Sequence, residues 1–323
     1  MFNKIVVPLD GSKLAEGVLP HVIEVIRGQE SQVYLLSASP LTKKPAPGAV
    51  STQPASVDAS NPQSIEQELI KYLQTVAKKL EPLACSVQVK VRFGRPANEI
   101  LAFASEIEAD LIIMSTHGRS GISRWVFGSV ADRLLRGASC PVLLVRAEQA
   151  QSQASYQNIL VPLDGSELAE QVLPYVKALI HAPKYPTKEK DRRVTHIYLI
   201  SVLTTGLGDR TVTLLTSYPP GMQLATTALH HAEVQLQTYL RSVAAALRDR
   251  GTAVHIAIRE GSPANEILTY AAEIGADLIS MTTHGLSGVS RWVYGNAADK
   301  VLQGTHSPVL LVRPTSEQGG KET

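Results

Sequence analysis

The sequence predicts an α/β protein made of two tandem doubly wound domains, each built on a five-stranded parallel sheet. Two observations predict this fold class. A long stretch of the chain occurs twice, and within each copy short apolar runs alternate with amphipathic helical patterns. The length of 323 residues also fits about two domains of ordinary size.

The repeat is clearest at the start of each copy. Residues 5–20 read IVVPLDGSKLAEGVLP and residues 159–174 read ILVPLDGSELAEQVLP, with thirteen of sixteen positions identical. Two further pairs match in the same order: residues 94–101 with 261–268 (GRPANEIL and GSPANEIL), and residues 116–137 with 283–304. The shared order indicates that the chain arose by duplication of one domain.

Five apolar runs in the first copy have the composition of buried parallel strands. They are KIVVP (4–8), VYLLSA (33–38), VQVKVRF (87–93), DLIIMS (110–115) and PVLLVR (141–146). Four helical patterns separate them: one continuous helix beginning after Ser12, an N-cap candidate, and helices over roughly 65–83, 97–107 and 130–135. Right-handed crossovers then place ligands at the carboxyl ends of the strands, near the switch point of strand order.

We place the first domain at 1–147 and the second at 156–314. The linker, 148–155, is rich in Gln, Ala and Ser, and the tail, 315–323, is expected to be disordered.

The second strand of each copy is followed by a segment rich in Pro, Ser, Thr and Gly, at 40–62 and at 204–220. Both segments are long for loops. A long loop at the carboxyl end of a strand is commonly a lid or a disordered segment, and a mobile flap is the interpretation we favour.

Composition excludes several classes of protein. A net charge of +2 is too weak to predict binding to nucleic acid or to an anionic membrane. No apolar run approaches the ~20 residues of a membrane helix, and the N-terminus enters a strand directly instead of a signal peptide, so we expect a cytoplasmic protein. Cys85 and Cys140 fit no metal-ligand spacing and are expected to be buried, reduced thiols.

Two motifs at the strand ends carry the chemistry. The motif after strand one supplies Pro8, Leu9 and Asp10, repeated as Pro162, Leu163 and Asp164. The motif after strand four supplies Ser115, His117, Gly118, Arg119, Gly121, Gly128, Ser129 and Val130, repeated as Thr282, His284, Gly285, Leu286, Gly288, Gly295, Asn296 and Ala297. Glycines let backbone N–H groups converge, and the following helix start adds its free N–H groups, which together bind phosphate. The alternative is that the glycines only shape a turn and that Ser12 and Ser129 only cap helices.

PLDGS, the HGRSGISRW-type loop and the closing CPVLLVR together resemble the universal stress protein family, over nearly the whole chain and twice. The resemblance implies an adenine nucleotide alpha hydrolase-like fold with strand order 3-2-1-4-5, and ATP binding that makes the chain a nucleotide-responsive stress protein. It places Asp10 and Asp164 near adenine or ribose, Ala38 and Val202 beside the base, and the glycine motif around the triphosphate. Mg²⁺ or Mn²⁺ would be coordinated by the phosphate oxygens of the nucleotide. The two copies would pair through their last strands, and a further homodimer is left open.

The chain departs from the pattern of ATP-binding members, which is Gly, two residues, Gly, nine residues, Gly and then Ser or Thr. The first glycine is replaced by Ser115 and Thr282, and the final hydroxyl residue by Asn296 in the second copy. A Cβ at the first position crowds the phosphates unless the backbone φ there is negative. The first copy, which keeps Ser129 and Arg119, is therefore the better candidate nucleotide site.

Other repeated side chains have two interpretations each. His117 and His284 could contact phosphate, although a donor to loop backbone is the interpretation we favour. Trp125 and Trp292 fit a packing role best.

The sequence lacks the P-loop lysine motif, a G-x-S-x-G elbow and an HExxH motif. We therefore expect a nucleotide binder with slow hydrolysis at most. One alternative is an interaction scaffold with degenerate pockets, and another is a slow ATPase or autokinase.

Overall fold

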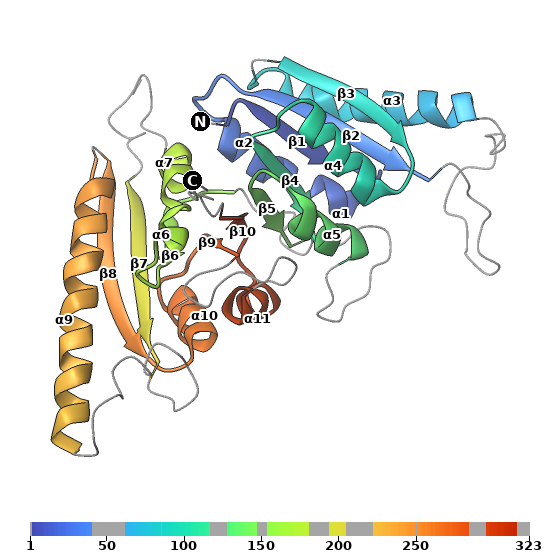
Figure 1. The fold of residues 1–323 in the computed structure, drawn as a ribbon. Coiled ribbons are helices and arrows are strands. Elements are labelled where there is room, and N and C mark those ends of the chain that lie inside the picture. Colours follow the sequence, from blue (N-terminus) through green and yellow to red (C-terminus); the bar gives the residue numbers. More distant parts are fainter. Residues whose placement is uncertain are drawn as a thin grey trace, which may run out of the picture. The chain divides into compact units, whose positions relative to one another are not determined.

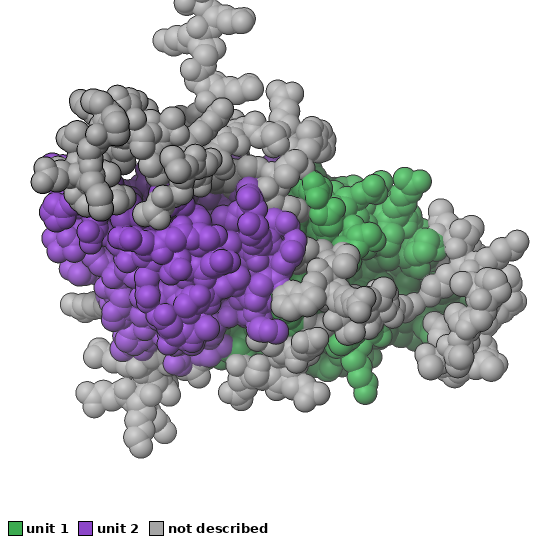
Figure 2. All heavy atoms as spheres, turned by 90° about the horizontal axis from the view of Figure 1, so that it is seen from below, with its two compact units in different colours: residues 1–154 green, residues 155–323 purple. Residues whose placement is uncertain are grey.

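The computed structural model describes residues 2–40, 62–84, 86–116, 128–146, 154–180, 194–204, 222–249, 251–283 and 295–314. The chain divides into two compact units, residues 1–154 and 155–323 (Figure 2). Both predicted flaps over most of their length, the loop residues 117–127 and 284–294, linker residues 148–153, the tail and Cys85 lie outside the described residues.

The first unit alternates strands and helices along the chain (Figure 1). Its elements are β1 (Lys4–Pro8), α1 (Lys13–Glu16), α2 (Leu19–Ile26), β2 (Gln32–Ser39), α3 (Pro62–Leu80), β3 (Ser86–Phe93), α4 (Pro96–Glu106), β4 (Leu111–Ser115), α5 (Ser129–Gly137) and β5 (Val142–Val145). All strand pairs are parallel and the spatial order is β3-β2-β1-β4-β5, which confirms the predicted fold class and strand order.

The second unit repeats this arrangement with the order β8-β7-β6-β9-β10. Its elements are β6 (Asn158–Pro162), α6 (Glu167–Glu170), α7 (Leu173–Leu179), β7 (Thr195–Leu203), α9 (Met222–Leu247), β8 (Thr252–Glu260), α10 (Pro263–Glu273), β9 (Leu278–Thr282), α11 (Asn296–Gly304) and β10 (Val309–Val312). In each unit the central strands are buried on both sides: Ile5, Val6 and Val7 in β1 and Ile159, Leu160 and Val161 in β6 are all inaccessible to solvent.

Helices cover both faces of each sheet. In the first unit α3 lies along β3 and is tied to α1 by an ion pair between Lys79 and Glu16, 3.1 Å apart. α4 packs on β2 and beside α5. Since right-handed crossovers to opposite sides of β1 place their helices on opposite faces, α1 to α3 form one layer and α4 with α5 the other.

The prediction of one continuous helix after Ser12 is wrong. The chain forms α1, turns at Gly17 and Val18, and begins α2 with Leu19 and Pro20. Proline has no N–H to bond to the carbonyl four residues earlier, and its ring would collide with that carbonyl. Pro20 is therefore tolerated only in the first turn of a new helix, and the second unit breaks in the same way at α7.

Among the described residues, no helix is long and apolar enough to cross a membrane. Cys140 is a free, half-buried thiol, and burial raises its pKa to about 11. Pairing of the two copies through their last strands stays a prediction.

His21 makes the stability of the first unit sensitive to pH. The side chain on α2 is 5% exposed, and burial lowers its pKa from 6.5 to about 4. Between pH 6.5 and 4, His21 is therefore protonated in the unfolded chain and neutral in the folded chain. The free energy of unfolding is not reduced by His21 above pH 6.5, and it falls as the pH is lowered toward 4, by about 3 kcal/mol at most.

We predict that His21→Gln flattens this dependence between pH 6.5 and 4. Urea unfolding of both proteins across that range measures it, and the difference between them removes the carboxylate titrations that they share. Parallel pH profiles for the two proteins would contradict the assignment.

Candidate functional site

Strands β1 and β4 separate toward their carboxyl ends. Their register pairs join Ile5 to Leu111 and Val6 to Ile112. Further along, β1 stays bonded to β2 as far as Pro8, and β4 to β5 as far as Ser115. The backbone continues in these opposite directions, since the Leu9 and Thr116 N–H groups donate to carbonyls of β2 and β5 respectively. This divergence lies at the switch point of the doubly wound sheet, where a ligand crevice is expected. We call this candidate site the crevice.

Asp10 lies on the β2 side of the crevice in a tight turn. Its Oδ1 accepts a hydrogen bond from the Ser12 N–H at 2.9 Å, and Gly11 adopts a φ of 82°. The Ser12 hydroxyl in turn accepts from Ala15 N–H at 3.1 Å, which caps α1 as predicted. One carboxylate oxygen of Asp10 thus holds the turn, which fixes the direction of the other.

The β4 side of the crevice ends at the start of α5. The Gly128 N–H donates to the Thr116 carbonyl at 3.3 Å, so the two ends of the glycine-rich segment lie together. Gly128 is the N-cap residue, with φ −55° and ψ 144°, and it has no side chain to satisfy the first N–H groups of the helix. Ser129 is exposed and is the first helical residue, so it does not cap α5. A helix start without a side-chain cap is the kind of backbone arrangement that can bind an anion through its first N–H groups and its positive end.

Ser115 does not strain the backbone at the position of the first glycine of the pattern described above. It is the last residue of β4, 8% exposed and in register with Val145. Thr282 ends β9 in the same way, 7% exposed and in register with Val312. Neither residue has a positive φ, so the backbone at this position tolerates a Cβ without strain.

The second unit reproduces the crevice closely. β6 and β9 pair only at Ile159 with Leu278 and Leu160 with Ile279 before they diverge. Asp164 Oδ1 accepts from the Ser166 N–H at 3.0 Å and from its hydroxyl at 2.6 Å.

The end of β9 is held in the same manner as that of β4. The Gly295 N–H donates to the Thr283 carbonyl at 2.8 Å, and Gly295 caps α11 with φ −55° and ψ 141°. The backbone donors of both copies are therefore equivalent, and the copies differ in side chains such as Ser129 and the exposed Asn296.

The proposed base-side residues lie at the ends of the second strands. Ala38 is half-buried near the end of β2, and Val202 is half-buried at the matching place in β7. The turn before α4 adjoins them, since the Gly94 N–H donates to Ser39 O at 2.9 Å.

The structure thus places sixteen of the predicted residues on strand ends, turns or helix starts around the two crevices. Their roles as ligand contacts stay predictions. His117, Gly118, Arg119 and Gly121, with His284, Gly285 and Gly288, lie outside the described residues. So do Trp125 and Trp292.

One residue pair escaped the sequence reasoning. Burial first, and then the Glu170 and Asp164 carboxylates, raise the pKa of the Tyr239 phenol on α9. α9 lies beside the turn of Asp164, since a Cβ at Gly165 would lie 4.0 Å from Leu236 Cδ2 on that helix. Tyr72 stands at the corresponding place in α3, and the shared Tyr-Leu pairs at 72–73 and 239–240 are a signal that could have found both.

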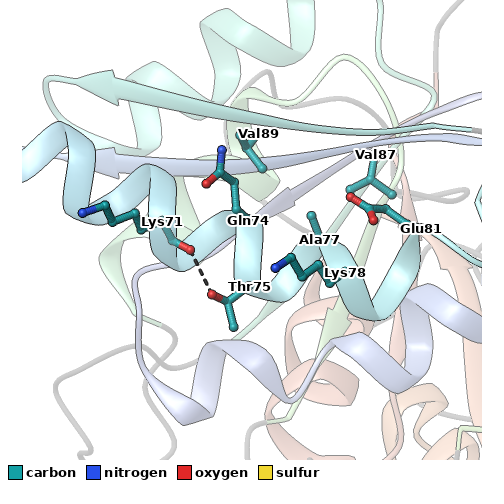
Figure 3. Close-up of a pocket in the computed structure, with 8 residues that line it drawn as sticks. All are labelled: Lys71, Gln74, Thr75, Ala77, Lys78, Glu81, Val87 and Val89. Atoms are coloured by element: carbon teal, nitrogen blue, oxygen red, sulfur yellow. Dashed lines mark hydrogen bonds between the residues drawn. The ribbon is translucent and has the colours of Figure 1, made fainter.

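A separate groove lies on the outside of the first unit, between α3 and the edge strand β3 (Figure 3). It is lined by Lys71, Gln74, Thr75, Ala77, Lys78, Glu81, Val87 and Val89. It contains none of the predicted site residues, and its positive charges are partly offset by Glu81. The described residues also hold no group of three or more side chains suited to a metal, so any metal at the crevice would depend on ligand oxygens.

Fold and crevices together define a tandem doubly wound α/β protein with two equivalent candidate sites. The model of the universal stress protein family matches residues 1–146 and 155–313. The chain belongs to this family.

Three known proteins illustrate what the chain is similar to. Universal stress protein MJ0531 of Methanocaldococcus jannaschii is 34% identical over 149 residues, which cover 45% of this chain and 83% of the relative. The crystal structure of a universal stress protein from Archaeoglobus fulgidus covers 98% of this chain and 98% of its own, with 20% identity and a TM-score of 0.62. Another universal stress protein, solved in complex with cAMP, covers 45% of this chain with 18% identity and a TM-score of 0.34.

Gly94 is required by the turn that adjoins the crevice. Its φ is 155°, and a Cβ there would lie within 2.9 Å of Glu99 Cγ. Gly28 is a matched control, because its φ is 71° and a Cβ there would meet nothing within 4 Å. We predict that Gly94→Ala lowers the free energy of unfolding by about 2 kcal/mol or more, and Gly28→Ala by about 1 kcal/mol. Urea unfolding of the two variants measures this, and equal losses would argue against a crowded turn at Gly94.

Proposed function

We propose that the protein binds ATP at the crevice where β1 and β4 diverge, and that binding acts as a regulatory signal in a stress response. The observation that supports this proposal is that the Asp10 turn follows β1 and the segment ending at α5 follows β4, two neighbouring strands that diverge. An acceptor for ribose or adenine then lies on one side, and free backbone donors for phosphate lie on the other.

The first unit is the stronger candidate. Backbone geometry at the start of α5 and α11 is the same, so the difference rests on side chains. Ser129 has a hydroxyl group that can donate a hydrogen bond to phosphate, whereas Asn296 has an amide group at the corresponding position. Arg119, where the second copy has Leu286, adds a cation that a triphosphate would favour.

We propose that hydrolysis is slow at most. The sequence has no P-loop lysine motif, and the described residues hold no group of three or more side chains suited to a metal. We propose that ATP acts by occupancy, ordering the segments that border the crevice and changing the surface offered to a partner. Pairing of the copies through β5 and β10 and a further homodimer belong to the same proposal.

Gly128→Asp tests the phosphate side of the crevice. An Asp at an N-cap satisfies helix N–H groups with its own carboxylate, so the fold is preserved while the anion-binding donors are taken and a negative charge is added. We predict that affinity for ATP falls about 100-fold or more. Calorimetric titration of the purified full chain measures it, with cAMP as a comparison ligand.

Gly128→Ala is the matched control. It adds the same Cβ, 3.3 Å from the Thr116 carbonyl, without the charge, so it should retain most of the affinity. Failure of the unaltered protein to bind ATP at millimolar concentration would overturn the proposal and favour the scaffold alternative. Equal losses in both variants would show that bulk, and not charge, is what the site rejects.

Asp10→Asn tests the base or ribose side. Asn keeps an oxygen that can accept from Ser12 N–H, so the turn persists, whereas the negative charge is removed. We predict about tenfold weaker ATP binding with an unchanged unfolding midpoint, because hydrogen bonds to a charged acceptor are the stronger kind. Asp164→Asn is the internal comparison, and it should have a smaller effect if the first unit is the main site. Unchanged affinity for ATP in both variants would show that these carboxylates do not take part in binding.

A further inference from the structure

The outer edge of the first sheet is formed by β3, and no described strand pairs with its outer side. All eight residues of β3 are in register with β2, from Ser86 beside Gln32 to Phe93 beside Ser39. Because β3 is the last strand in the spatial order, it directs a row of backbone N–H and C=O groups outward. Such an edge can take up an extended peptide as an additional strand.

The groove between α3 and β3 gives this edge an apolar floor (Figure 3). Val87 and Val89 lie on one face of β3, because alternate residues of a strand share a face, and both are half-buried. Ala77 of α3 lines the same groove and is buried. A strand added to β3 would place every second side chain beside the two valines, so apolar residues fit at those positions.

The polar residues of the groove carry a net positive charge. Lys71 and Lys78 line it from α3, and Glu81 is the one acidic residue among the lining side chains. The two lysines are exposed and lie two turns apart, about 10.5 Å along the helix axis at 1.5 Å per residue. Their long side chains can therefore reach a peptide over several of its residues.

Lys90 adds a third positive charge to this edge, on the other face of β3. Its side chain is exposed, whereas the neighbouring Arg92 is already paired with Glu106 of α4. A lysine in an edge strand opposes pairing with the same edge of a second copy, because like charges would come close. The same lysine attracts a strand that carries acidic residues.

The fold does not require these three lysines. By strand register and by the shared Tyr-Leu pairs of α3 and α9, the positions of Lys71, Lys78 and Lys90 are occupied in the second unit by Thr238, Ala245 and Ala257. The second unit has Arg241 and Arg248 at the places of Gln74 and Glu81 instead. The two outer edges therefore differ in charge pattern, although their strands and helices correspond.

We infer that the edge of β3 and the groove beside it bind an extended acidic peptide of a partner protein by strand addition. Apolar residues at every second position of the peptide cover Val87 and Val89, and acidic residues between them meet Lys90. Lys71 and Lys78 contribute further attraction from the side of the helix. Backbone hydrogen bonds supply affinity, and the lysines select for negative charge.

The test is a titration of the full chain, without nucleotide, into a fluorescently labelled ten-residue peptide of alternating Glu and Val. Fluorescence anisotropy should show binding that weakens as salt is added, because exposed charges are screened. A peptide of alternating Lys and Val should bind at least tenfold more weakly. Equal binding of the two peptides would overturn the inference. Because no nucleotide is present, the outcome is independent of the proposed ATP binding.

Variants that install the residues of the second unit test the lysines. Lys71→Thr, Lys78→Ala and Lys90→Ala together should lower the affinity for the Glu-Val peptide about tenfold or more. Lys79→Ala is the matched control for Lys78→Ala, because Lys79 is paired with Glu16 on α1 and does not line the groove. Equal losses in these two single variants would show that only net charge matters and would overturn the site.

Amide hydrogen exchange locates the peptide. The Glu-Val peptide should slow exchange in β3 and leave exchange in β8 unchanged. Protection in β8 instead, or no binding of the peptide at all, would overturn the inference. Protection of β3 that grows with protein concentration in the absence of peptide would assign this edge to a second copy of the chain, and would overturn it as well.

Discussion

The parting of β1 from β4 is the constraint on which the candidate site depends. Two register pairs hold the strands together at their start, and each strand then follows its outer neighbour. Because the sheet is wound outward in both directions from this point, the connections that follow β1 and β4 leave the sheet edge toward opposite sides. The Asp10 turn follows one of these strands, and the segment that ends at α5 follows the other.

Duplication has preserved this backbone while the side chains around it diverged. The Asp10 and Asp164 turns have nearly the same hydrogen bonds, and the caps at Gly128 and Gly295 agree within a few degrees. At the outer edges away from the crevices, by contrast, lysines of one copy stand where uncharged residues occur in the other. Each unit therefore serves as a natural reference for the other.

The strands could be predicted from the sequence because buried parallel strands are local signals that occur twice, whereas the strand order followed only from the resemblance to the family. The break before Pro20 could have been read from the proline alone, since its missing N–H acts within one turn of helix. Tyr239 was harder, because its approach to Asp164 depends on how a distant helix packs. The groove beside β3 could not be predicted either, because it depends on how α3 packs against the edge of the sheet.

The hydrogen bond from Gly128 to Thr116 has a consequence for how this family can vary. It joins Thr116 and Gly128 across the eleven residues that separate them in the sequence, so folding already meets the entropy of bringing these two positions together. Thr283 and Gly295 are joined in the same way in the second unit. Both units therefore keep the same two anchor points while the sequences between those points differ.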